Sequence, residues 1–74
     1  MKIPTSELFG LLEAQQNHTV EASLNDGTFN ATHFFRFGGR KVFDCGIDSV
    51  EASWNVEDFL AFYSQAYWRV DQIV

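Results

Sequence analysis

The residue types that could do chemistry are few, and the first candidates are a histidine and the single cysteine in the middle of the chain. His33 and Cys45 fall on the apolar side of an alternating pattern, and our preferred register places them side by side on neighbouring strands. A thiolate with an imidazole base is the chemistry of a nucleophilic enzyme. However, the pattern buries both side chains, and spacing places no third member or oxyanion donor. The sequence therefore ranks an enzyme last and predicts no catalytic residue, cofactor or metal site.

A second group of candidates is basic. Arg36, Arg40 and Lys41 surround the glycine pair Gly38 and Gly39. Such side chains could contact phosphate or an acidic protein surface. Charged residues also occur at hairpin tips because they keep the turn soluble and block edge pairing. The basic tip is therefore both a candidate contact and a candidate solubility feature.

The third group is aromatic and is the most informative for function. Phe34 and Val42 are the large apolar side chains that the preferred register leaves on the outer, polar face of the sheet. Arg36 lies beside Phe34 there, and we expect it to form a surface ion pair with Asp44. An aromatic side chain among polar groups resembles the anchor of a binding surface. Trp68 is a further candidate, at a sheet edge or dimer contact, although core packing is favoured in so small a domain.

A sheet must position these residues, because apolar and polar residues alternate almost without interruption from Thr19 to Trp54. Turn signals divide this stretch at Asp26-Gly27, at the double glycine and at Asp48-Ser49. The residues on this period fall at 20–24, 29–37, 43–47 and 50–54, and each group predicts one strand. They form a four-stranded antiparallel meander with one apolar face.

The double glycine decides which residues share that apolar face. A two-residue loop would put the apolar residues from Phe43 onward on the face opposite Phe35. A three-residue loop with a glycine bulge pairs Phe35 with Phe43 and keeps a single apolar surface. Because exposing such groups costs roughly 1.5–3 kcal/mol each, we predict the three-residue loop. The flanking hairpins then pair Val20 with His33, and Phe43 with Trp54.

Helices are predicted on either side of the meander. The first spans residues 5–16 and is capped by Thr5 or Ser6. Asn55 caps the second, whose apolar stripe continues to the C-terminus. Residues 67–74 also have the aromatic and β-branched character of a short edge strand, so both interpretations stay open with the helix preferred.

Composition limits the class of protein. The 74 residues form one domain, residues 1–74, of two-layer α+β architecture in which the helices cover the apolar face. One cysteine cannot form an internal disulfide, so stability must come from a rich core. A chain that is 46% hydrophobic and 16% aromatic can supply such a core, and a homodimer could add to it. The net charge of −5 opposes nonspecific nucleic-acid binding and favours basic partners. With no export signal or membrane-spanning run, we expect a cytoplasmic protein with Cys45 as a free thiol.

Three functions are compatible with these observations. The first is a non-enzymatic protein-binding module, a small acidic adaptor or inhibitor such as phages encode, acting through the open face around Phe34, Arg36 and Val42 or through the basic tip. The second is a small-molecule or single-stranded nucleic-acid binder that stacks its ligand on Phe34 beside Arg36, which the acidic balance opposes. The third is the Cys/His enzyme.

Overall fold

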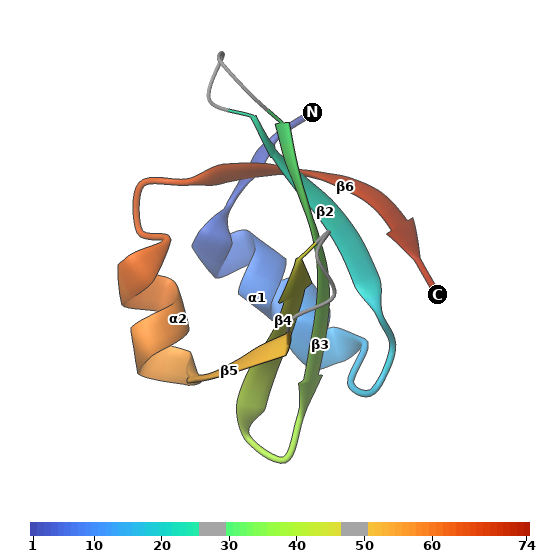
Figure 1. Cartoon of the computed structure of the whole chain (residues 1–74), viewed down its shortest axis with the longest axis vertical. Helices are drawn as coiled ribbons and strands as arrows, with labels where there is room; N and C mark the ends of the chain where they lie inside the picture. The colour runs from blue at the N-terminus through green and yellow to red at the C-terminus, as the bar shows by residue number, and fades with distance from the viewer. Residues whose placement is uncertain (26–29, 47–50) are drawn as a thin grey trace.

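The structure is a computed structural model that describes residues 1–25, 30–46 and 51–74. In chain order its elements are β1 (Ile3–Pro4), α1 (Thr5–Ala14), β2 (Val20–Asn25), β3 (Asn30–Gly38), β4 (Lys41–Gly46), β5 (Glu51–Asn55), α2 (Val56–Phe62) and β6 (Tyr67–Ile73). The strands form one antiparallel sheet in the order β1-β6-β2-β3-β4-β5 (Figure 1). The α+β class is confirmed, and the predicted meander corresponds to the four strands β2 to β5 of this larger sheet.

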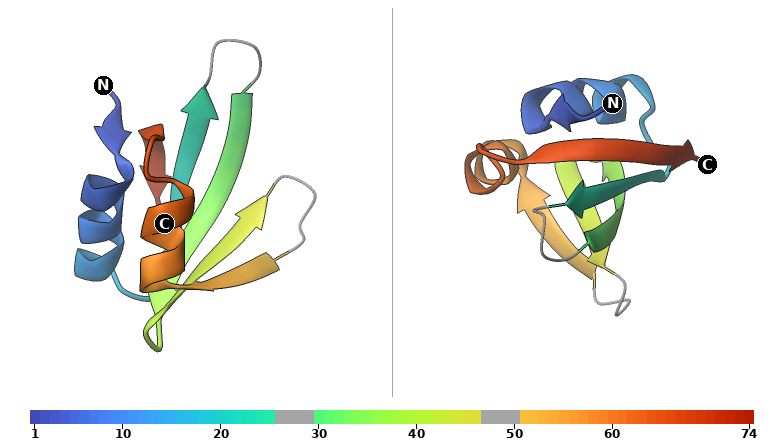
Figure 2. Two further views of the ribbon diagram at one scale, coloured as in Figure 1. Left: turned by 90° about the vertical axis from the view of Figure 1, so that its left-hand side faces the viewer. Right: turned by 90° about the horizontal axis from the view of Figure 1, so that it is seen from above.

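The sheet curls, and both helices pack on its concave face (Figure 2). The core lies between the helices and the sheet. It consists of Leu8, Leu12, Val20, Ala22, Phe35, Phe37, Val42, Phe59 and Trp68. Among the described residues, neither helix covers the convex face of β2, β3, β4 and β5 (Figure 2). The two faces of the sheet therefore have different surroundings, one packed and one open to solvent, as antiparallel sheets commonly do.

The C-terminal segment is a strand, so the preferred helical interpretation of residues 67–74 is wrong. The alternative is confirmed as to the strand, but β6 is not the last strand in the sheet order. The helix stops at Phe62, and β6 lies between β1 and β2. Trp68 and Val70 face the concave side, while the intervening Arg69 is exposed. In this position β6 pairs with the backbone of β2, which would otherwise be an unpaired sheet edge.

The β3–β4 turn has two residues, so the predicted three-residue loop is wrong. Gly38 pairs with Lys41, which leaves Gly39 and Arg40 in the turn. Both have positive φ angles, 58° and 65° respectively. This is the backbone of a primed turn, whose twist matches that of the flanking strands. Arg40 thus takes a left-handed conformation that the residue types alone did not indicate.

The even loop inverts the predicted faces of β4. Phe35 pairs with Asp44 rather than with Phe43. Val42, predicted on the outer face, is fully buried on the concave face. It pairs with Trp54, so the predicted pairing of Phe43 with Trp54 is wrong. Phe43 lies instead on the convex face. A one-residue change of register moves every side chain of a strand to the other face, and this is the case here.

The β2–β3 hairpin keeps its predicted faces although its register differs. Val20 pairs with Phe35 rather than with His33, a shift of two residues. An even shift leaves the described side chains of both strands on the faces predicted for them. The turns predicted at Asp26-Gly27 and Asp48-Ser49 lie outside the described residues.

The start of α1 differs from the prediction in its cap. The cap residue is Pro4, and no side chain caps the helix. The Thr5 hydroxyl donates to the backbone oxygen of Tyr63 at 2.7 Å and accepts from Trp68 Nε1 at 2.9 Å. Thr5 is therefore a buried link between α1, the end of α2 and β6.

The start of α2 is as predicted. The Asn55 side chain accepts a hydrogen bond from the backbone N–H of Asp58 at 2.8 Å. Glu57 and Asp58 in the first turn also interact favourably with the helix dipole. The cap fixes the point at which the chain leaves β5 and turns onto the concave face.

Candidate functional site

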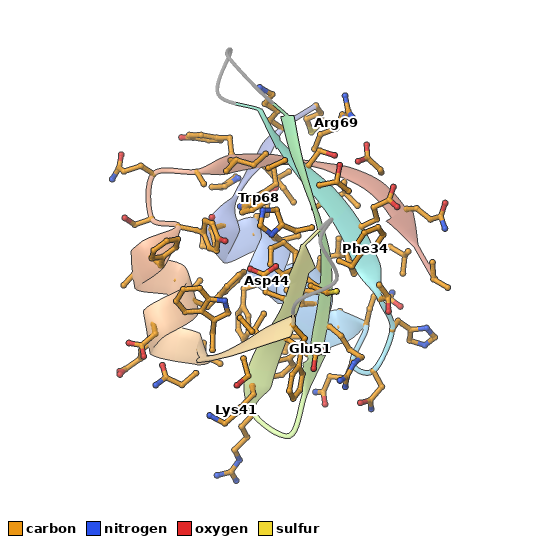
Figure 3. All side chains as sticks on the ribbon, viewed as in Figure 1. Phe34, Lys41, Asp44, Glu51, Trp68 and Arg69 are labelled. Carbon is orange, nitrogen blue, oxygen red and sulfur yellow. The ribbon has the colours of Figure 1, made fainter. Side chains whose placement is uncertain are left out.

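The convex face is organised around Phe34, in the middle of the sheet. Its side chain is 37% exposed, and it points away from the core (Figure 3). Glu21 on β2 and Cys45 on β4 are its cross-strand partners. Glu51 on β5 is in turn the partner of Cys45. These four side chains form one row across four strands, with a carboxylate at each end.

A second row runs beside the first and contains the predicted contact residue Arg36. Its cross-strand partner is Phe43, which itself pairs with Ser53. The Arg36 guanidinium lies 4.4 Å from the centroid of the Phe43 ring. A cation–π contact of this kind is worth about 0.5–1 kcal/mol at an exposed site. It holds Arg36 in place and half-buries Phe43, which reduces the cost of placing an aromatic residue on this face.

We call the two rows together the convex patch. Its residues are Glu21, Phe34, Cys45 and Glu51 in the first row and Arg36, Phe43 and Ser53 in the second. Sequence analysis found Phe34 and Arg36. It missed Phe43 and Cys45, because their place on this face follows from the even turn between β3 and β4, for which the alternative two-residue loop was the signal. It missed the alignment of the two carboxylates because that also depends on the registers of the β2–β3 and β4–β5 pairs, both of which differ from the prediction.

The predicted basic tip is exposed but lies apart from Phe34. Arg40 and Lys41 are both exposed at the β3–β4 turn, and Lys41 projects from the lower end of the hairpin in Figure 3. Gly38 lies four positions after Phe34 along the extended strand, which corresponds to about 13 Å. The structure thus brings Arg36 beside Phe34 but leaves the other two cations at the end of the hairpin.

Two of the predicted contact residues are not on the surface. Val42 and Trp68 are fully buried in the core. For Trp68 this confirms core packing, which sequence analysis favoured over an edge or dimer contact. For Val42 the expectation of an exposed side chain is wrong, because the β3–β4 turn reverses the faces of β4.

The His33 and Cys45 side chains do not meet. His33 pairs with Gly46 and faces the concave side, whereas Cys45 pairs with Phe34 and faces the convex side. The predicted thiol–imidazole pair is therefore wrong in its geometry. Cys45 is a free, half-buried thiol whose described hydrogen bond runs to the backbone oxygen of Gly46 at 3.7 Å.

His33 is instead bonded to Asp44, which sequence analysis placed on the outer face as a partner of Arg36. Asp44 is buried on the concave face, where its Oδ1 lies 2.7 Å from His33 Nδ1. The Tyr63 hydroxyl donates to Asp44 Oδ2 at 3.2 Å. The expected ion pair between Arg36 and Asp44 is therefore wrong, because the two residues lie on opposite faces of the sheet.

His33, Asp44 and Tyr63 form a cluster on the concave face that stabilises the fold. The His33 ring is stacked on Phe35 at 5.4 Å and meets Trp68 edge-on at 5.3 Å. Burial raises the pKa of the Tyr63 hydroxyl above its usual value, and the neighbouring Asp44 carboxylate raises it further. An aspartate bonded to a histidine can orient a general base, but here the imidazole is packed among aromatic rings. The cluster ties β3 and β4 to the end of α2.

Comparisons with known proteins do not assign the chain to a family. No family model, no curated protein and no solved structure matches it. Residues 1–25, 30–46 and 51–74 contain no cluster of three or more side chains suited to a metal ion. Over the same residues, no helix is long and apolar enough to cross a membrane. The convex patch is the candidate site that the geometry supports best.

Proposed function

We propose that the protein is a non-enzymatic protein-binding module, a small acidic adaptor or inhibitor, that acts through the convex patch. The observation that carries this proposal is the position of Phe34, a partly exposed aromatic side chain at the centre of a sheet face that neither described helix covers. Aromatic and arginine side chains dominate the binding energy of protein interfaces. Phe34 and Arg36 supply both within one patch.

The arrangement of charges in the patch specifies the chemistry of the partner. Glu21 and Glu51 lie at the two ends of the row that contains Phe34. They are three strands apart, which corresponds to about 14 Å. A complementary surface would present an apolar side chain between lysine or arginine residues. The net charge of −5 would also speed the approach of a basic partner.

The test is affinity capture from a lysate of the source cells, with three forms of the immobilised protein. Phe34→Asp introduces a charge at the centre of the patch and should abolish capture of the partner. Tyr67→Asp is the matched control, because Tyr67 is also an exposed aromatic strand residue, on β6 rather than in the patch. The control should capture the partner as the wild type does. Circular dichroism checks that both variants are folded.

Two results would contradict the proposal. One is capture of the same partner by the wild type and by Phe34→Asp, and the other is equal loss in both aspartate variants. Glu21→Gln with Glu51→Gln should weaken capture and reduce its dependence on salt, because these carboxylates face the basic groups of the partner. Capture of nucleic acid, lost on nuclease treatment, would instead favour the alternative of single-strand binding.

A further inference from the structure

The two edges of the sheet are protected to very different extents. One edge consists of β1 and the part of β6 that β1 does not cover. Strand β1 has only two residues, and one of them is Pro4, which has no N–H to offer. Short edge strands and proline are common means by which proteins prevent pairing with another chain.

The exposed part of β6 carries two further protective features. Ala22 pairs with Val70 while Glu21 pairs with Gln72, so Asp71 is the extra residue of a β-bulge. Asp71 accepts hydrogen bonds from Ser23 at 2.6 Å and from Arg69 at 2.7 Å, and these bonds lower its pKa. A bulge and a charged pair both oppose the addition of a strand.

The opposite edge, β5, lacks these features. All five residues of Glu51–Asn55 form the edge, and they contain no proline. Their pairing with β4 is continuous and shows no bulge. In Figure 2 no described helix or strand lies along the free side of β5, and α2 leaves from its end. A regular, uncovered edge is a template for another strand.

The sequence of β5 is complementary to itself in an antiparallel pair. With Ser53 on a two-fold axis, Glu51 of one copy faces Asn55 of the other, so no like charges are opposed. Ala52 faces Trp54, a small side chain opposite a large one. Because the two-fold axis passes through Ser53, each concave-face residue of one copy pairs with a concave-face residue of the other. The two sheets therefore join into one continuous sheet.

Apolar surface on the concave face next to this edge would be covered by the same pairing. Phe62 on α2 is 67% exposed, and its ring lies 4.9 Å from that of Trp54. Ala52 is also exposed, on the same face. In the paired arrangement Trp54 of one copy covers Ala52 of the other, and the two α2 helices lie on the same side of the joined sheet.

We therefore propose that β5 is the interface of a homodimer, in which two copies pair antiparallel through Glu51–Asn55 about Ser53. The proposal does not depend on the protein-binding function, because it uses the backbone edge of β5 and leaves Phe34 and Arg36 uncovered. Glu51 and Ser53 belong to both surfaces. The two also differ in their dependence on salt. Dimerisation brings together copies of charge −5 and should tighten as salt screens the repulsion, whereas binding of a basic partner should weaken.

Sedimentation equilibrium over a wide range of protein concentration tests the dimer. The wild type should dimerise, and Ala52→Lys should be monomeric, because it places a charge where Trp54 of the second copy would pack. Ala14→Lys is the matched control, since Ala14 is an exposed residue at the end of α1, and it should dimerise as the wild type does. Phe34→Asp should also dimerise.

Cysteine cross-linking tests the register. In a Cys45→Ser background, Ser53→Cys should form an intermolecular disulfide under mild oxidation, because directly paired Cα atoms lie about 4.5–5.5 Å apart. Glu51→Cys should not, since the two copies of residue 51 would be about 14 Å apart. A wild type that stays monomeric at every concentration would overturn the proposal. So would a dimer that survives Ala52→Lys, or equal cross-linking at both positions.

Discussion

Phe34 and Phe35 are neighbours on β3, and their side chains lie in opposite surroundings. Phe35 is fully buried, and its ring meets those of Phe59 and Trp68 edge-on at 5.4 and 5.2 Å. Phe34 is 37% exposed, between Glu21 on one neighbouring strand and Cys45 on the other. The concave face thus holds the interactions that stabilise the fold, and the convex face holds side chains that remain available for contact.

The carboxylates on the two faces show the same contrast. Asp44 is buried on the concave face, and it is held by His33 and by the Tyr63 hydroxyl. Glu21 and Glu51 lie on the more open convex face, at the ends of the row through Phe34. A buried carboxylate must have its hydrogen bonds satisfied within the protein, whereas one on an open face can be satisfied by water or by a partner.

The largest expected effect on stability is at Phe35, and it distinguishes this residue from Phe34. Phe35→Ala should lower the free energy of unfolding by about 3–5 kcal/mol, because it leaves a cavity among packed aromatic rings. In a domain of this size such a loss is a large part of the total stability. Urea denaturation followed by tryptophan fluorescence measures it. A loss below about 1 kcal/mol would show that Phe35 is not in the core.

Removal of the buried carboxylate should have the next largest effect. Asp44→Ala leaves the Tyr63 hydroxyl and His33 without their acceptor, and this should cost about 1–3 kcal/mol. Glu51→Ala is the matched control on the convex face, and it should change stability by less than about 0.5 kcal/mol. If Asp44→Ala and Glu51→Ala lowered the free energy of unfolding equally, the carboxylates on the two faces would not differ in their contribution to stability.

Sequence analysis predicted the elements with local signals better than the pairings that depend on distant residues. The alternation along β2 and β3 placed Phe34 outside and Phe35 inside, and the Asn55 cap marked the start of α2. These features depend on the order of polar and apolar residues along one strand, or on a cap that accepts from a backbone N–H three residues further on. Both can be read from a short stretch of chain.

The faces of β4 were predicted incorrectly for a physical reason. The prediction buried Phe43 because exposing a large apolar side chain costs free energy, and the alternation then placed Asp44 on the outer face. Burying a carboxylate costs free energy as well. In the structure the stacked guanidinium of Arg36 offsets the first cost, and the Tyr63 hydroxyl, from beyond α2, offsets much of the second. Partners so distant in the chain have no signature in the local pattern.

The effect of pH should distinguish the two described tyrosines. The pKa of Tyr63 is raised in the folded state, so the protonated form is favoured by folding. This contribution is fully present below the unfolded pKa of about 10, and it is lost as the pH rises above that value. The loss should be at most about 1 kcal/mol per pH unit, since Tyr63 is only half-buried.

Urea denaturation between neutral and alkaline pH measures this effect. Tyr63→Phe should be less stable than the wild type at neutral pH, because a hydrogen bond to Asp44 is lost, but its stability should fall less steeply above pH 10. Tyr67→Phe is the control, since Tyr67 is exposed, and it should follow the wild type. Parallel curves for all three proteins would contradict the placement of Tyr63 beside a buried carboxylate.

The smallest effect on stability is expected at the residue on which the proposed function depends. Phe34→Ala should lower the free energy of unfolding by about 1 kcal/mol or less, because its ring packs on one side only. The same substitution should strongly weaken capture of a partner, since a central aromatic side chain contributes most to an interface. Measured beside Phe35→Ala, it compares two adjacent phenylalanines that differ only in the face they occupy. A stability loss of several kcal/mol at Phe34, as at a core position, would mean that the convex face is covered by another part of the assembly.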